Sequence, residues 1–202
     1  MKYPRVFVAG TFDGLHKGHR VFLSQAFKNG NTVTIGLTSD KFVKKVKMRR
    51  FDERKRDLEQ WLKDRGYEKR STIISIDDPY EPAASFPQNA ALMVTQDNKH
   101  RGEEINAIRK KRGLPLFTLV EIPLVKAEDN RPISSTRMRN GEIDERGKLI
   151  LPDNLRPQLQ QPLGLVLHDE MIARSLKEHK ESIIITVGDV ATKTLLDARL
   201  TP

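Results

Sequence analysis

Two histidines three residues apart, His16 and His19, carry the clearest chemical signal in this sequence. They belong to the run Gly10–His19, which follows a short apolar segment and precedes a helical pattern. Gly14 and Gly18 allow the backbone to approach a phosphate closely, and a helix that begins here directs free N–H groups into the same space. Two imidazoles so placed can donate hydrogen bonds to oxygens that gain negative charge during phosphoryl displacement. The run therefore predicts a catalytic, phosphate-binding turn.

Chance placement on a surface loop and half of a metal site are the alternative explanations of these two histidines. A zinc site needs further ligands. The chain has no cysteine, and its remaining histidines, His100, His168 and His179, have no suggestive spacing. The position between a strand and a helix argues against chance. We therefore expect no metal held by the protein itself.

A second motif is the run Ile133–Arg139, in which three hydroxyl residues precede two arginines. The hydroxyls of Ser134, Ser135 and Thr136 could simply cap a helix. Consecutive small hydroxyl residues at a helix start also make an anion pocket, and Arg137 one turn further could neutralise a polyphosphate. Beside the histidine motif, the phosphate-binding interpretation is favoured.

A basic loop, Thr38–Arg50, follows the second predicted strand. Most of its charges are expected to be solvated. Lys41 is different because it lies at the carboxyl end of a strand, where it could reach a substrate phosphate. Its basic neighbours could attract anionic substrates without touching them.

The elements that must position these motifs alternate between strand and helix. Strands are predicted at Arg5–Ala9, Thr32–Leu37, Ser71–Ile76, Ala91–Thr95 and Thr118–Ile122. Helices are predicted at about Gly18–Phe27, from a cap at Asp52 to a stop at Gly66, at Glu103–Lys111 and at Ile133–Asn140. Continuously apolar strands in such an alternation predict an α/β, Rossmann-like fold with a five-stranded parallel sheet and helices on both faces. Ligands of such sheets bind at the carboxyl ends of the strands.

Composition limits the classes of protein to consider. The 202 residues are 37% hydrophobic and 31% charged, with no cysteine and no apolar run long enough to cross a bilayer. We expect a cytoplasmic protein without membrane attachment. The net charge of +9 would also suit a nucleic-acid-binding module. Phe42 and Phe51 are the only rings of the basic stretch Lys41–Arg56, so it lacks the aromatic interleaving of single-strand binders, and we expect no nucleic-acid partner.

Together the two motifs resemble the nucleotidyltransferase superfamily with a His-x-Gly-His motif and a late Ile-Ser-Ser/Thr signature. The similarity is greatest to archaeal-type phosphopantetheine adenylyltransferases, through Lys126–Asp144 and Ile105-Asn106-x-x-Arg109. The resemblance implies transfer of AMP from ATP to 4′-phosphopantetheine, giving dephospho-coenzyme A and pyrophosphate in coenzyme A biosynthesis. The alternative within the superfamily is another acceptor: FMN, nicotinamide mononucleotide, or a phosphoalcohol with CTP.

The resemblance also assigns roles to residues and a cofactor. Catalysis is implied for His16, His19, Lys41 and Arg137, and binding of the acceptor phosphate for Thr11 and Lys41. ATP binding is implied for Gly10, Thr11, Phe12, Gly18, His19, Ser134, Ser135, Thr136 and Arg137. Mg²⁺ is implied as an ion held by the ATP phosphates. Relatives have a Ser-Glu-Glu-Thr type sequence after the fourth strand, where this chain has Thr95–Asn98. The segment Thr95–Arg101 is therefore expected near the nucleotide, and no residue of it is assigned to recognise the base.

The domain organisation predicted is a nucleotidyltransferase domain at residues 1–148 and a short α/β appendage at residues 149–202. The appendage has a predicted helix at Asp169–His179 and a strand at Ser182–Val187. Leu151–Pro157 and Thr186–Val190 resemble the beginning of the archaeal GTP-dependent dephospho-coenzyme A kinase. About 50 residues are too few for a self-sufficient domain. We expect a remnant or truncated fusion without kinase activity, and the sequence leaves the oligomeric state open.

Overall fold

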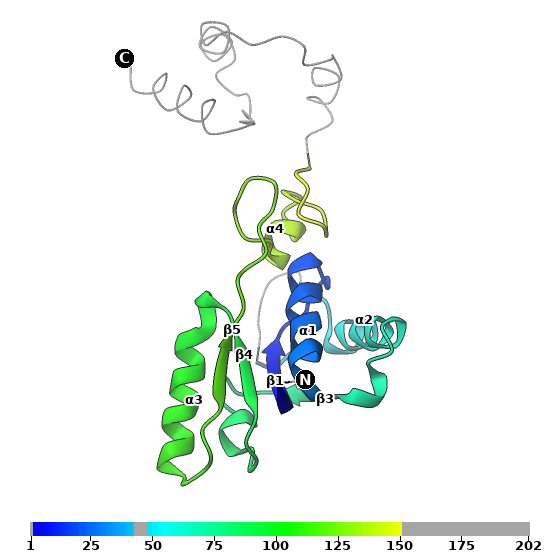
Figure 1. Cartoon of the computed structure of the whole chain (residues 1–202). Helices are drawn as coiled ribbons and strands as arrows, with labels where there is room; N and C mark the ends of the chain where they lie inside the picture. The colour runs from blue at the N-terminus through cyan, green and yellow to red at the C-terminus, as the bar shows by residue number, and fades with distance from the viewer. Residues whose placement is uncertain (1, 43–47, 151–202) are drawn as a thin grey trace, which may run out of the picture. The chain divides into compact units, whose positions relative to one another are not determined.

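The computed structural model describes residues 2–42 and 48–150, all within one compact unit, Met1–Ile150. Five parallel strands form a single sheet in the order β3-β2-β1-β4-β5. Their bounds are β1 Tyr3–Gly10, β2 Gly30–Thr38, β3 Ser71–Ile76, β4 Ala91–Val94 and β5 Thr118–Glu121. The helices are α1 Lys17–Asn29, α2 Phe51–Asp64, α3 Lys99–Lys111 and α4 Ser135–Arg139. The predicted parallel α/β architecture is confirmed (Figure 1).

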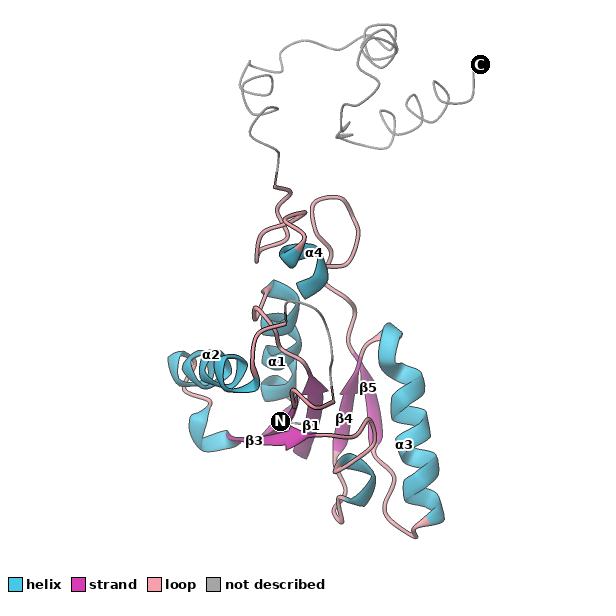
Figure 2. Cartoon of the chain, turned by 180° about the vertical axis from the view of Figure 1, so that it is seen from behind, coloured by secondary structure: helices cyan, strands magenta, loops and turns pink. Residues whose placement is uncertain are grey.

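Helices cover both faces of the sheet because the strand side chains alternate between two apolar cores (Figure 2). Val6 and Val8 of β1 pack with buried residues of α1 and α2. Phe7, between them, joins the core on the other face, where Ile105 of α3 packs. The sheet is therefore buried on both sides, which explains its continuously apolar strands.

Three helix starts differ from the sequence-based expectation, and one of them is that of α4, which begins at Ser135 and not at Ile133 because Ser134 is its N-cap. The predicted cap at Asp52 is wrong, since α2 begins at Phe51 and Arg50 is its N-cap. The Arg50 N–H donates to the Glu53 carboxylate at 2.9 Å, so Asp52 lies in the first turn, where its charge favours the helix dipole. Helix α3 begins at Lys99, four residues before the predicted start, because the short 3₁₀ turn Gln96–Asn98 leads directly into it.

The residues Asn106 and Arg109, which support the resemblance to the adenylyltransferases, have a structural role. The Asn106 amide hydrogen-bonds both the N–H and the C=O of Phe117 at the entrance to β5. Arg109 is fully buried, donates to the carbonyls of Ala83 and Phe86, and lies 3.8 Å over the Phe117 ring. These contacts attach α3 to the amino-terminal end of the sheet, away from the strand ends that carry ligands.

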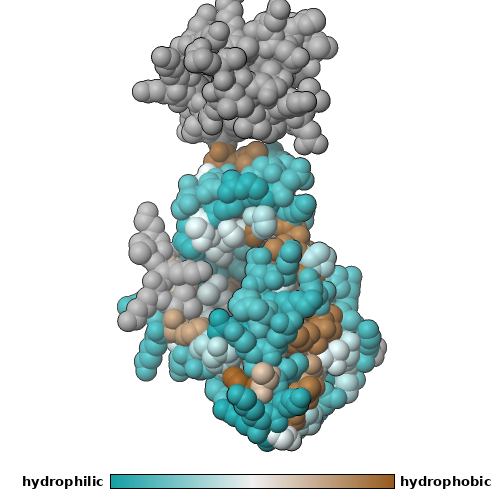
Figure 3. All heavy atoms as spheres, turned by 90° about the vertical axis from the view of Figure 1, so that its left-hand side faces the viewer, coloured by the Kyte–Doolittle hydropathy of each residue, from teal (hydrophilic) through white to brown (hydrophobic). Residues whose placement is uncertain are grey.

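The surface over α3 is mostly hydrophilic, with apolar atoms visible in a narrow band (Figure 3). None of the helices in the described part of the chain is both long and apolar enough to span a membrane. The predicted appendage, with its helix, its strand and its resemblance to a kinase, lies outside the described residues apart from its first two.

Candidate active site

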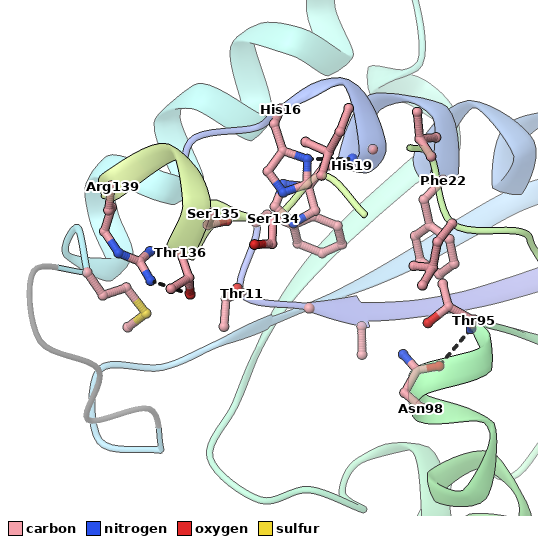
Figure 4. A pocket seen from close by; sticks show the side chains of 18 of the residues that line it. Thr11, His16, His19, Phe22, Thr95, Asn98, Ser134, Ser135, Thr136 and Arg139 are labelled. Carbon is pink, nitrogen blue, oxygen red and sulfur yellow. Dashed lines mark hydrogen bonds between the residues drawn. The ribbon is translucent and has the colours of Figure 1, made fainter. Parts of the chain in front are cut away.

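A cavity of about 290 Å³ opens at the carboxyl edge of the sheet, beside the point where the strand order reverses between β1 and β4. Segments far apart in sequence meet here: the end of β1 and the start of α1, the turn after β4, the segment after β5, and α4 (Figure 4). The predicted site residues that line it are Gly10, Thr11, Phe12, His16, Gly18, His19, Ser134, Ser135 and Thr136. The cavity therefore unites the two sequence motifs.

The turn that carries the histidines is sharply folded. Phe12 and Leu15 have positive φ angles of 45° and 23°, and Gly14 has a φ of 75°, a conformation that glycine adopts without strain. Glycine is required at position 18 for a steric reason, because a Cβ atom there would lie 3.1 Å from the His16 ring. Its expected role was to admit a phosphate, whereas the observed effect of its missing side chain is to give His16 room.

The two histidines form one stacked unit at the start of α1. Their ring centroids lie 3.7 Å apart at an interplanar angle of 16°, and Phe12 contacts His19 edge-on at 5.3 Å. The His19 N–H donates to Nδ1 of His16 at 3.3 Å, which makes His16 the N-cap of α1. Because Nδ1 of His16 accepts, the proton of its neutral ring lies on Nε2.

Burial keeps both imidazoles neutral. His16 is 4% exposed, and its burial, reinforced by the charge of Arg20, lowers its pKa to about 4. Burial and the neighbouring His16 lower the pKa of His19 to about 3. Nδ1 of His19 is buried without a hydrogen-bond partner. At neutral pH each ring therefore offers one N–H and no positive charge until an anion binds.

The three hydroxyl groups of the second motif have different hydrogen-bonding states. Ser134 caps α4 by accepting from the Arg137 N–H at 3.3 Å, so its own proton stays available. Ser135 donates its proton to the carbonyl of Asp13 at 2.6 Å, which joins α4 to the histidine turn. Thr136 accepts from Arg139 at 3.1 Å and also keeps its proton. Ser134 and Thr136 can thus donate to a ligand, while Ser135 holds the two motifs together.

Arg139 is the arginine of this motif that lines the cavity. Its guanidinium bonds the buried Asp13 carboxylate at 2.6 Å, and Asp13 also binds Arg49 at 3.2 Å. Asp13 therefore links Arg139, at the cavity, to Arg49, which also pairs with Asp57 at 2.7 Å. Neither Asp13 nor Arg139 was predicted as a site residue from the sequence, although each lies within one of the two motifs.

Arg137 does not line the cavity, contrary to its predicted role as a phosphate ligand. Its buried side chain bonds Asp129, the Glu142 carboxylate at 3.0 Å and the Pro132 carbonyl at 3.1 Å. Burial alone would raise the pKa of Asp129, but the hydrogen bond from Arg137 and further contacts hold it below its usual value. Arg137 therefore secures the loop that precedes α4.

Lys41, the predicted acceptor ligand after β2, is exposed and does not line this cavity. Thr11 does line it, and its carbonyl accepts a hydrogen bond of 2.8 Å from Arg54. Arg54 is fully buried and also bonds Asp40 at 3.0 Å and the Arg49 carbonyl at 2.9 Å. This arginine, which the sequence did not single out, ties together the ends of the basic loop and the end of β1.

The opposite wall of the cavity is largely apolar. Residues Pro123–Val125 and Ile133 contribute to it, and Thr95 and Asn98 close its edge. The Thr95 N–H donates to the Asn98 side chain at 2.7 Å (Figure 4). The segment expected near the nucleotide is therefore part of the cavity, beside a surface suited to a flat ring.

Comparisons with known proteins identify relatives of this chain. A family described as cytidylyltransferase-like matches residues 7–141. The phosphopantetheine adenylyltransferase of Methanothermobacter thermautotrophicus is 41% identical over 151 residues, which are 74% of this chain and 91% of the relative. A bifunctional phosphopantetheine adenylyltransferase/NTP phosphatase of Thermoplasma acidophilum is 36% identical over 86% of this chain and 53% of its own length. A crystal structure of an Archaeoglobus fulgidus protein of unknown function aligns with a TM-score of 0.51 at 28% identity, covering 60% of this chain and 89% of that one.

Proposed function

This chain belongs to the cytidylyltransferase-like family, and we propose that it is a phosphopantetheine adenylyltransferase. It transfers AMP from ATP to 4′-phosphopantetheine, giving dephospho-coenzyme A and pyrophosphate. The observation that carries the proposal is the meeting of the histidine turn with the Ser134–Arg139 motif around one cavity. Relatives named for this activity align over most of the chain, at 41% and 38% identity.

The reaction is an in-line displacement at phosphorus. A phosphate oxygen of the acceptor forms a bond to the α-phosphorus, and the bond from that phosphorus to the oxygen bridging to the β-phosphate breaks. The bond electrons leave with pyrophosphate, so the protein supplies no covalent nucleophile. Its contribution is positioning and stabilisation of charge that moves onto the phosphate oxygens.

The residues of the cavity match that task. The Nε2–H of His16 and the ring N–H of His19 donate hydrogen bonds to the oxygens around the α-phosphorus. The β- and γ-phosphates accept hydrogen bonds from the free hydroxyl groups of Ser134 and Thr136 and from the guanidinium of Arg139. Neutral imidazoles suit this role, because bound phosphates stabilise the imidazolium form only as negative charge accumulates.

The two substrates are assigned to opposite sides of the histidine turn. The apolar wall of Pro123–Val125 and Ile133, with Thr95 and Asn98, receives the base of the nucleotide. The acceptor phosphate is assigned to Thr11 and, from the neighbouring strand end, Lys41. Lys41 lies outside the cavity in this structure, so its side chain must turn inward when the acceptor binds.

Mg²⁺ fits this site as an ion carried by ATP. The donors that line the cavity are N–H and hydroxyl groups, and Asp13, the buried carboxylate beside it, is occupied by two arginines. The described part of the chain has no cluster of three or more histidine or acidic groups that could hold the ion directly. Bound to the phosphates, Mg²⁺ would neutralise charge on the departing pyrophosphate.

Pyrophosphate release tests the proposal directly. Purified protein is assayed with ATP, Mg²⁺ and 4′-phosphopantetheine, beside reactions with CTP and with FMN, and beside a His19→Ala variant. Turnover is expected only with ATP and phosphopantetheine, and a loss of at least about 100-fold in kcat is expected in the variant. Pyrophosphate release with CTP or with FMN would support the proposed role of the histidines and would show that the assigned substrate is wrong.

A further inference from the structure

A second hollow lies between α1 and α2 and shares no lining residue with the catalytic cavity. This groove has a volume of about 660 Å³. The side chains that matter for its chemistry are Arg20, Arg49, Trp61 and Arg65, and Gly14–Leu15 contribute backbone at one edge.

Unpartnered hydrogen-bonding atoms are concentrated at this groove. In residues 2–42 and 48–150, four buried side-chain nitrogen or oxygen atoms have no hydrogen-bond partner. One is Nδ1 of His19, in the catalytic cavity, where a substrate can supply the partner. The other three are Nε of Arg20, Nη2 of Arg49 and Nε1 of Trp61, and all three residues line the groove. Since buried donors are normally satisfied, three such donors on one groove indicate a ligand that accepts hydrogen bonds.

The charges of the groove specify the ligand further. Its carboxylates are already engaged: Glu145 pairs with Arg20 at 2.9 Å, Asp57 pairs with Arg49 at 2.7 Å, and Asp64 accepts from Gln60 at 2.7 Å. Arg65 lies 5.8 Å over the Trp61 ring and has no carboxylate partner among the described residues. The three arginines of the groove are matched by three carboxylates, so its remaining capacity lies in the unpartnered N–H donors. These suit a phosphate group, because its oxygens accept hydrogen bonds from guanidinium groups in bidentate geometry.

We propose that this groove is a second ligand site that binds a phosphate group through Arg20, Arg49 and Trp61. The two arginine side chains are 39% and 38% exposed, so their guanidinium groups can turn toward a ligand. Trp61 is 8% exposed and supplies a buried N–H in the last turn of α2. The phosphate can be free in solution or part of an organic molecule.

Occupancy of the groove acts on the catalytic cavity through one carboxylate. Arg49 binds one oxygen of Asp13 at 3.2 Å, and Arg139 binds the other at 2.6 Å. A phosphate on Arg49 competes with Asp13 for that arginine. Asp13 then pairs more strongly with Arg139 and restrains it from the ATP phosphates. This consequence depends on the proposed function, whereas binding in the groove does not.

The single tryptophan of the chain makes the site directly observable. Tryptophan emission is titrated with inorganic phosphate at constant ionic strength, with NaCl as the control. A saturable change is expected in the wild type and in His19→Ala, and at least about a tenfold weaker response is expected in the double variant Arg20→Gln/Arg49→Gln. No saturable change, or a change lost in His19→Ala and kept in the double variant, would overturn the proposal.

A conservative variant protects the test against misfolding. Trp61→Phe keeps an aromatic ring in the core and removes the N–H together with part of the indole ring, so calorimetry should show phosphate binding weakened by about 3- to 10-fold. Equal affinity in the variant contradicts a role for the indole. Titrations with inorganic phosphate, pyrophosphate and 4′-phosphopantetheine are compared. The compound that binds most tightly identifies the molecule that carries the phosphate group.

Kinetics test the coupling separately. Inorganic phosphate should lower kcat at saturating ATP in the wild type, and Trp61→Phe should require about 3- to 10-fold more phosphate for the same effect. Phosphate that binds the groove but inhibits only in competition with ATP would refute the coupling through Asp13. If the enzyme has no adenylyltransferase activity, the emission titration still decides whether the groove binds phosphate.

Discussion

Replacing Arg137 and Arg139 one at a time by methionine separates support of the site from contact with ATP. The two arginines lie two residues apart in one short helix, and both bond carboxylates. Only Arg139 lines the cavity. Methionine keeps the length and apolar stem of the side chain, so each variant removes chiefly the guanidinium.

The expected magnitudes follow from the surroundings of each arginine. Arg137→Met leaves Asp129 and Glu142 with Arg131 as their only arginine partner among the described residues, at 3.8 and 4.0 Å, and since these carboxylates are 23% and 35% exposed, the loss of stability should be about 2–3 kcal/mol. For a unit of this size that lowers Tm by roughly 5–10 °C. Arg139→Met leaves Asp13 still paired with Arg49, so it should cost about 1 kcal/mol of stability. Its kcat should fall by about 100- to 1000-fold, as expected for removal of a charge-stabilising donor.

The assay combines thermal denaturation with steady-state kinetics on both variants, measured well below the lower Tm. Arg137→Met should retain kcat within about tenfold of the wild type once folded. Arg137→Lys and Arg139→Lys are the matched controls that restore the charge. If Arg137→Met lost the larger part of kcat while Arg139→Met stayed active, the assignment of the phosphate-binding arginine would be refuted.

Three further perturbations follow from the same structure. Lowering the pH from 7 to 4.5 should reduce the free energy of unfolding by roughly 4–5 kcal/mol, because unfolded histidines with a pKa near 6.5 bind protons that folded His16 and His19 exclude. Urea titrations should show that this loss of stability begins below pH 6.5, and that it is smaller in the variant His16→Asn. Gly18→Ala should raise or preserve Tm, since alanine favours helix by about 1 kcal/mol. Its kcat should fall at least about tenfold, because the new methyl group displaces the His16 ring, and an unchanged kcat would contradict that contact. Arg54→Met should cost about 2–4 kcal/mol, because the carbonyls of Thr11 and Arg49 lose a buried donor, and calorimetric Tm values measure it.

The pattern of the sequence was sufficient for the architecture. Five apolar runs alternating with helical segments predict a parallel sheet, because such strands must be covered on both faces. Helix starts were less predictable. Arg50 caps α2 in place of the expected Asp52, because the position of the cap depends on how Asp40 and Glu53 bind backbone N–H groups near the loop end.

The motifs also indicated which segments form the site. Nine of the eleven residues predicted to act at it line one cavity, and Lys41 and Arg137 do not. Spacing alone could not choose between Arg137 and Arg139, because neighbouring side chains of a short helix diverge and the direction of each depends on the partners around it. Asp129 and Glu142 bind the first, and Asp13 binds the second.

Residue types and their order thus predicted that this chain binds phosphates, through histidines, hydroxyl groups and glycines that follow the ends of strands. The tertiary structure decides which side-chain protons at the cavity are used within the protein and which stay available. It stacks His16 on His19 and lowers their pKa values by burial, and it uses the Ser135 proton to join two motifs. It also brings three unpartnered donors together in the groove between α1 and α2. These properties depend on desolvation and on contacts between residues distant in the chain, which local sequence does not encode.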